Sequence, residues 1–225
     1  MKSPEQLAVD VLTDWVEQNT PEGHGLLVPV SGGSDSALAA YVCSQAVGDR
    51  ASGIYFGDSL RSQDWFEQQM SIEVVESYDD NLDAEASRWA HVITRGLVDH
   101  EVIVGTRNRT EDVLGTYSSA SKVAAMLPLV GVWKTDVMRL CQYIDVPQEI
   151  IDSSRQADDD CGRPENLAAI PFDVLDDFLK VKVGELPLDT KLAIGEDELA
   201  YLESVYAKNR FKDLLPYVGP RVKIY

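Results

Sequence analysis

Short apolar runs alternate along this chain with longer amphipathic stretches. The runs with the length of buried strands lie at residues 25–30, 52–56, 72–75 and 101–106. Apolar residues at helical spacing predict helices at 4–18, 35–47, 62–69, 84–97, 107–114, 134–143, 172–181 and 196–208. Strands that alternate with helices favour a parallel sheet with helices on both faces. The expected fold class is therefore α/β, with a Rossmann-like, doubly wound and mostly parallel sheet.

Pro29 conflicts with the first predicted strand, because proline has no N–H to donate to a neighbouring strand. The surrounding residues, Leu26 to Val30, are otherwise all apolar, and we retain the strand. The polar and acidic stretch at residues 153–165 is expected to form a loop.

The turn after the first strand reads Ser-Gly-Gly-Ser-Asp-Ser, at residues 31–36. A strand, a glycine turn and a helix in this order direct backbone N–H groups toward one point, which favours an anion. Glycine lets the backbone approach an oxyanion, and serine hydroxyls add donors. Asp35 would repel a phosphate unless a divalent cation bridged the two. The loop lacks the Gly-x4-Gly-Lys-Ser/Thr pattern of the P-loop NTPases.

Composition narrows the class of protein. The chain has 225 residues, 44% of them hydrophobic, so we expect one domain over residues 1–225. It contains no apolar run of about 18 residues and no apolar N-terminal core, which predicts no membrane partner, and its scattered cysteines are typical of the reducing cytoplasm. A net charge of -18 disfavours nucleic acid as a partner. Three scattered cysteines predict neither a disulfide framework nor a zinc site.

Residues 105–111, 127–137 and 147–151, together with residues 31–36, resemble motifs of the ammonia-dependent NAD synthetases, a family of the ATP pyrophosphatase (PP-loop) superfamily. Residues 105–111 read Gly-Thr-Arg-Asn-Arg-Thr-Glu and lead to a Leu-Gly pair. Residues 127–137 contain Leu-Pro-Leu and Trp-Lys-Thr-Asp-Val, and residues 147–151 match the next stretch in order. The resemblance identifies the chain as a divergent member. It implies an adenine nucleotide alpha hydrolase-like fold and no glutaminase domain.

The resemblance implies an ATP-dependent, amide-forming ligase that acts in two steps. ATP adenylates the carboxylate of deamido-NAD and releases pyrophosphate, and ammonia then displaces AMP. By resemblance, Asp35, Glu111 and Lys134 are catalytic, and Asp35 and Glu111 hold Mg²⁺. ATP and pyrophosphate are assigned to Ser31, Gly32, Gly33, Ser34, Asp35, Ser36, Thr106 and Lys134, and the acceptor to Arg88 and Lys122. The family is homodimeric, so helix 4–18 and the segment 123–133 are expected at an interface.

The resemblance breaks at residues 116–126. There the family has Thr-Lys-(Tyr/Phe)-Gly-Asp-Gly-x-x-Asp, whose lysine and last aspartate contact deamido-NAD. In this chain the lysine falls near Ser118 or Ser119 and the aspartate on Ala125. Lys122 is the candidate replacement for the lysine, and no acid replaces the aspartate. Two hypotheses follow: an NAD synthetase with a rebuilt acceptor site, or a related amide ligase that activates a different carboxylic acid.

Structural explanations and other function classes stand beside these assignments. The alternative for Glu111 is an acid in the first turn of a helix, and the alternative for Thr106 is a helix cap. The alternatives for Lys134 and Arg88 are a solvated helix residue and a surface arginine. A tRNA-thiolating enzyme is disfavoured by the net charge and by the acidic neighbours of Cys161, which raise a thiol pKa. A catalytically silent nucleotide-binding protein would bind ATP with Mg²⁺ and release no pyrophosphate.

Overall fold

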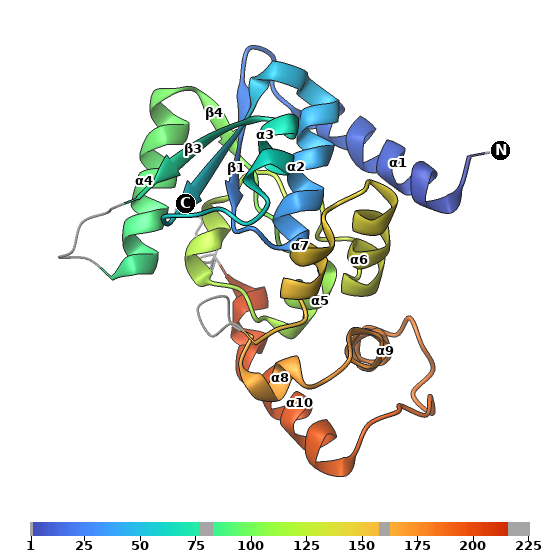
Figure 1. Cartoon of the computed structure of the whole chain (residues 1–225). Helices are drawn as coiled ribbons and strands as arrows, with labels where there is room; N and C mark the ends of the chain where they lie inside the picture. Colours follow the sequence, from blue (N-terminus) through green and yellow to red (C-terminus); the bar gives the residue numbers. More distant parts are fainter. Residues whose placement is uncertain (1, 77–82, 158–162, 216–225) are drawn as a thin grey trace, which may run out of the picture.

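The computed structural model describes residues 2–76, 83–157 and 163–215, and Figure 1 shows the arrangement. Within these residues the sheet has four strands, all parallel, in the order β3-β2-β1-β4. The strands are β1 (Gly25–Val30), β2 (Ala51–Phe56), β3 (Ser71–Val75) and β4 (Glu101–Ile103). This parallel α/β sheet confirms the fold class predicted from the alternating pattern.

Every helix predicted from the periodicity is present, and each end lies within two residues of its expected place. The helices are α1 (Pro4–Asn19), α2 (Ser34–Val47), α3 (Gln63–Gln69), α4 (Ala84–Val98), α5 (Arg109–Leu114), α6 (Lys134–Tyr143), α7 (Gln148–Ser153), α8 (Glu165–Ala168), α9 (Phe172–Lys182) and α10 (Glu196–Asn209). Short 3-10 turns, η1 (Gly48–Arg50), η2 (Ser119–Val123) and η3 (Arg210–Leu214), complete the described elements. None of the helices in the described part of the chain is long and apolar enough to cross a membrane.

Side chains of β1 alternate between the two faces of the sheet, as the pleat requires. Leu26, Val28 and Val30 join the largest core cluster, which also contains α1, α2 and α6. Leu27 points to the other face and packs with Val92 of α4. Helices therefore cover both faces, and the central strand is buried on each side.

A third cluster joins the C-terminal helices to the rest of the molecule. Leu114 of α5, Phe178 of α9 and Leu202 of α10 are almost completely buried in it. Figure 1 shows α8, α9 and α10 gathered beyond the sheet, on the side where α5 lies. This packing sets α9 against both α5 and α6.

The fourth strand is shorter than the predicted range 101–106. β4 ends at Ile103, and Val104 forms an isolated bridge with Met126 instead. Gly105 follows this path and donates its N–H to the Met126 carbonyl at 2.8 Å. A Cβ on Gly105 would lie 2.6 Å from Leu127 Cδ2 and 2.9 Å from Ala124 Cβ, so this close approach favours glycine.

The early end of β4 also explains Pro29. The Leu27 carbonyl accepts a hydrogen bond from Val104 N–H at 2.9 Å, so the backbone N–H and C=O of Leu27 point toward β4. Residue 29 lies two positions further and faces the same side, where β4 has already diverged. The missing proline donor therefore interrupts no ladder hydrogen bond, and β1 keeps its pairing with β2 through Val30.

The strand order places two loops together. β1, β2 and β3 run outward in one direction, and the chain then returns to add β4 on the other side of β1. In open parallel sheets such a reversal opens a crevice at the carboxyl ends of the strands, where ligands bind. The loops at residues 31–33 and 104–108 both begin at this crevice.

Candidate functional site

The turn between β1 and α2 has the geometry of an anion site. Gly32 has a φ of 75°, which favours glycine. Gly33 is the N-cap of α2, and no side chain caps this end. The first N–H groups of a helix have no partner within the helix, and they carry its positive dipole end. Ser34 N–H is taken by Ser154 Oγ at 3.0 Å, which leaves the following N–H groups for a ligand.

The serines of this turn are largely engaged with one another. Ser36 Oγ donates to the Gly33 carbonyl at 2.9 Å and lies 3.2 Å from Ser31 Oγ. Ser34 Oγ accepts hydrogen bonds from Ser154 Oγ and from Lys134 Nζ, both at 2.8 Å. These hydroxyls therefore hold the turn in shape, and the backbone is the main source of donors for an anion.

Asp35 joins three elements at the crevice. Its carboxylate accepts a hydrogen bond from Asn108 Nδ2 at 2.9 Å and forms an ion pair with Lys134. Asn108 is the N-cap of α5 and Lys134 is the first residue of α6. The structure thus brings together two site residues that the sequence separates by 99 positions.

Lys134 is a buried residue, so its interpretation as a solvated helix residue is wrong. It is 5% exposed. Its Nζ lies 5.5 Å from the centre of the Phe172 ring, besides its contacts with Asp35 and Ser34. A buried ammonium held by a carboxylate and a hydroxyl keeps its charge in a fixed position.

Glu111 is both a capping residue and a buried acid. It forms a capping box with Asn108, which makes Asn108 the cap of α5 and corrects the alternative assignment to Thr106. Burial raises the pKa of Glu111 to about 7, repulsion from Asp35 adds to this, and the charge of Lys134 opposes it. Glu111 and Asp35 are therefore close enough to repel each other in a poorly hydrated site.

The two carboxylates fit a magnesium site completed by substrate. Mg²⁺ in phosphate-binding sites takes one or two carboxylates and fills its other positions with phosphate oxygens and water. No group of three or more His, Cys, Asp or Glu residues suited to a metal exists in residues 2–76, 83–157 and 163–215. Asp35 and Glu111 fit this pattern, since a cation between them would relieve their repulsion.

Asp176 is a buried acid that the sequence analysis missed. It lies on α9, has 0% exposure, and accepts hydrogen bonds from Thr110 Oγ1 at 2.5 Å and from Thr135 Oγ1 at 2.7 Å. Thr110 Oγ1 accepts in turn from Lys134 N–H at 2.9 Å. Burial raises the pKa of Asp176 although these hydrogen bonds oppose the rise. The sequence did contain a signal for a buried acid, because Asp176 lies on the apolar face of the predicted helix 172–181.

Arg163 is a second residue that the sequence analysis missed. Its guanidinium lies 4.0 Å from the centre of the Phe172 ring, the ring that Lys134 also approaches. Its Nε is buried and has no hydrogen-bond partner in the described part of the chain. Burial lowers the pKa of Arg163, and the charges of Asp35 and Glu111 oppose this. The crevice therefore holds two cations and two carboxylates.

The two residues assigned to the acceptor lie on other elements, Lys122 in η2 and Arg88 on α4. Lys122 Nζ donates to the carbonyls of Lys212 at 2.7 Å and Leu215 at 3.2 Å. Arg88 lies half-buried on α4. Residues 158–162, which include Cys161 and part of the predicted loop 153–165, lie outside the described residues.

Comparison with known proteins identifies the family of this chain. The family model for NAD synthase matches residues 6–85 and 61–216. The NH3-dependent NAD+ synthetase of Pyrococcus furiosus is 24% identical over 241 residues, which cover 94% of this chain and 93% of that protein. The corresponding synthetase of Methanocaldococcus jannaschii is 25% identical over 244 residues, covering 92% and 94%.

Solved structures share the fold. An NH3-dependent NAD synthetase from Campylobacter jejuni has a TM-score of 0.71 at 17% identity and covers 97% of this chain and 100% of its own. An NMN synthetase from Francisella tularensis has a TM-score of 0.76 at 18% identity, with 98% and 100% covered. Together with a family model that spans almost the whole chain, these findings show that the protein belongs to the NAD synthase family.

Proposed function

We propose that this protein is an ATP-dependent, amide-forming ligase that converts the carboxylate of deamido-NAD into the amide of NAD with ammonia. The observation that carries the proposal is the cluster of Asp35, Lys134 and Glu111 at the glycine turn of a NAD synthase family member. The relatives named above are NH3-dependent NAD+ synthetases, and this chain covers nearly their whole length.

In the first step, a carboxylate oxygen of the acceptor attacks the α-phosphorus of ATP, and the bond to pyrophosphate breaks. The backbone of residues 31–36 binds the departing pyrophosphate, and Thr106 and Lys134 contact ATP. Arg163 adds positive charge at the same crevice. Asp35 and Glu111 would hold Mg²⁺, which neutralises charge on the phosphate oxygens when it is bound.

In the second step, ammonia attacks the carbonyl carbon of the acyl-adenylate. The new carbon–nitrogen bond forms, the carbon–oxygen bond to AMP breaks, and the nitrogen loses a proton to solvent. A carboxylate is a poor electrophile until its oxygen leaves as AMP, so both steps are needed. We further propose that residues 1–225 act as one unit that takes free ammonia in the cytoplasm, where the buried free thiols of Cys43 and Cys141 stay reduced.

A homodimer through α1 is part of the proposal. Leu7, Val11 and Trp15 are 51%, 66% and 41% exposed, and their spacing of four places them on one side of the helix. The segment 123–133 contributes less to a surface than expected, because Leu129 and Trp133 are buried in it. An apolar stripe of this kind suits a second copy of the chain.

A different carboxylic acid as acceptor is the second candidate function. It is favoured by the segment 116–126, which departs from the family pattern, and by Lys122, whose Nζ is bound to backbone carbonyls. The family's lysine and aspartate contacts at residues 116–126 are replaced here by other residues, and the acid has to be found by assay.

Pyrophosphate release tests both candidates. Wild-type protein with ATP, Mg²⁺ and ammonium is assayed without an acceptor, with deamido-NAD, and with nicotinate mononucleotide. Deamido-NAD should stimulate release and yield NAD, and Asp35→Ala should lower the rate at least 100-fold. Asp136→Ala, an exposed acid in the first turn of α6, is the control and should keep the rate. ATP binding without any stimulation by deamido-NAD would reject the NAD synthetase assignment.

A further inference from the structure

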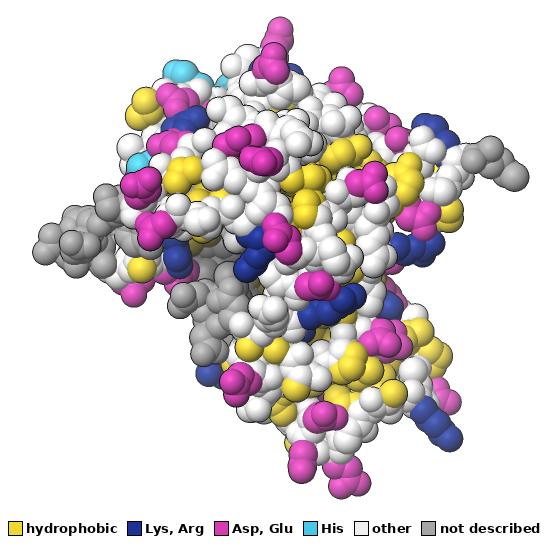
Figure 2. All heavy atoms as spheres, viewed as in Figure 1, with side chains coloured by type: hydrophobic (Ala, Val, Ile, Leu, Met, Phe, Trp, Pro, Cys, Tyr) yellow, Lys and Arg dark blue, Asp and Glu magenta, His cyan; other side chains and the backbone are white. Residues whose placement is uncertain are grey.

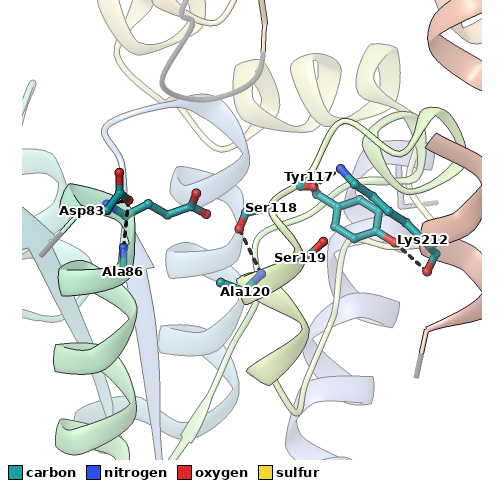
Figure 3. A pocket seen from close by; sticks show the side chains of 8 residues that line it. Asp83, Ala86, Tyr117, Ser118, Ser119, Ala120 and Lys212 are labelled. Atoms are coloured by element: carbon teal, nitrogen blue, oxygen red, sulfur yellow. Dashed lines mark hydrogen bonds between the residues drawn. The ribbon is translucent and has the colours of Figure 1, made fainter. Parts of the chain in front are cut away.

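Three cations surround the ring of Tyr117, beside a cavity of about 340 Å³. Arg107 Cζ lies 3.8 Å from the ring centre, Lys212 Nζ 5.1 Å and Lys122 Nζ 5.6 Å. Figure 3 shows the start of α4 on one side of this cavity and Tyr117 with Lys212 on the other. The cavity lining includes the acids Asp83 and Glu85 on the α4 side and, of the three cations, Lys212 on the Tyr117 side.

Two of the three cations are committed to the backbone. Lys212 Nζ donates to the carbonyls of Gly115 at 2.7 Å and Tyr117 at 2.6 Å. Lys122 Nζ donates to the carbonyls of Lys212 at 2.7 Å and Leu215 at 3.2 Å. These bonds tie the loop before η2 to the end of the described chain. Both lysines therefore tie these backbone segments together.

Arg107 is the cation that keeps unused donors. Its side chain is 10% exposed, and its Nε lies 3.2 Å from Asp112. Nε and Nη1 are buried and make no hydrogen bond to any described residue. A guanidinium presents five N–H donors in a fork that matches a carboxylate, and buried donors without partners are rare. An anion with two oxygens would satisfy this group.

The position of Arg107 connects the cavity to the adenylation site. It stands between Thr106 and Asn108, and Asn108 donates to Asp35. Its charge also lowers the pKa of Glu111. Its guanidinium stacks on Tyr117, which lines the cavity. Arg107 therefore joins the ring of Tyr117, which lines the cavity, to the loop whose Asn108 binds Asp35.

We propose that Arg107 binds the carboxylate of the acceptor and selects the acid over the amide, while the rest of the acceptor occupies the cavity beside Tyr117. The inference rests on the proposed function only for the identity of that acid. Arg107 thereby takes the role that the sequence analysis gave to Lys122.

Calorimetric binding of an acid and its amide tests this role. Deamido-NAD and NAD are titrated into wild type, Arg107→Gln, Arg107→Lys and Arg109→Gln, with Mg²⁺ and an α,β-methylene ATP analogue that blocks adenylation. Arg107→Gln should weaken deamido-NAD about 10- to 100-fold and leave NAD unchanged. Arg107→Lys keeps the charge without the fork and should give an intermediate loss. Arg109 pairs with Glu185 and lies 5.0 Å from Trp133, so Arg109→Gln should bind like the wild type.

Three results would overturn the inference: no binding of deamido-NAD by the wild type, unchanged binding in Arg107→Gln, or an equal loss for acid and amide, which would mean a phosphate contact. Thermal unfolding of each variant shows whether it is folded, and Arg107→Lys decides the question if Arg107→Gln is not. A different result would reject the proposed function and not this inference: deamido-NAD binds in a way that depends on Arg107, but no NAD forms in the assay with ATP and ammonium.

Discussion

At the scale of single residues, Glu111 determines how the site responds to pH. Its pKa of about 7 in the folded protein lies above its ordinary value of 4.5. Between these values the folded state keeps a proton that the unfolded state has lost. The free energy of unfolding therefore falls as the pH rises through this window, and stays lower above it. A cation bound between Glu111 and Asp35 would lower this pKa and release the proton.

Glu111→Gln should remove this pH dependence from the metal-free protein. Glutamine keeps the capping box with Asn108 but carries no charge, so the variant should be more stable than wild type at pH 8, by on the order of 1–3 kcal/mol, and similar at pH 4.5. Thermal unfolding with EDTA at several pH values measures this. Glu17→Gln, an exposed acid on α1, is the control. A variant less stable than wild type at pH 8 would contradict the environment described for Glu111.

At the scale of elements, the site is built from helices that begin at one point. α5 and α6 start beside the glycine turn, and α9 holds their first turns through Asp176. The side chain of Asp176 accepts three hydrogen bonds, two from hydroxyls and one from Thr135 N–H. The position of Lys134 therefore depends on α9, which holds the first turn of α6 through Asp176 and approaches Lys134 Nζ with the ring of Phe172.

Asp176→Asn should destabilise the protein and misplace Lys134. The NH2 group of asparagine is a donor, and it would face donors at a position where the carboxylate accepts hydrogen bonds. We therefore expect the free energy of unfolding to fall by about 2–4 kcal/mol. Urea unfolding measures the loss, and the ratio of kcat to KM for ATP reports on the site. Asp177→Asn is the matched control. Asp177 follows Asp176 in the chain, and its carboxylate pairs with Lys180 at the surface. Equal effects of both variants would reject the positioning role.

At the scale of the whole molecule, the surface is strongly acidic. Figure 2 shows Asp and Glu side chains spread over the visible face with Lys and Arg between them, in keeping with the net charge of -18. Two copies that associate through α1 repel each other at long range, because both carry this charge. The free energy gained from apolar contact along α1 has to exceed this repulsion, and added salt would weaken the repulsion.

Replacing Leu7, Val11 and Trp15 together by serine should convert the proposed dimer into a monomer. These side chains are exposed in the isolated chain, so the variant should keep its unfolding temperature when it is compared as a monomer. Light scattering after size-exclusion chromatography gives the mass, and higher salt should strengthen the wild-type dimer. Leu188→Ser, at a residue 90% exposed elsewhere, is the control. A wild type that is monomeric at high protein concentration would contradict the interface.

The sequence by itself determined where the predicted strands and helices follow one another along the chain, and it determined the glycine turn at residues 31–36. Local spacing encodes these features, because side-chain periodicity and glycine conformation act within a few neighbouring residues. Short motifs also pointed to Asp35, Glu111 and Lys134. What only the tertiary structure decided is which groups are buried and paired: the ion pair of Asp35 with Lys134, the support from Asp176, the use of Lys122 by the backbone, and the open donors of Arg107. These depend on segments distant in the chain, since burial and charge pairing are set by what packs against a residue and not by its neighbours in sequence.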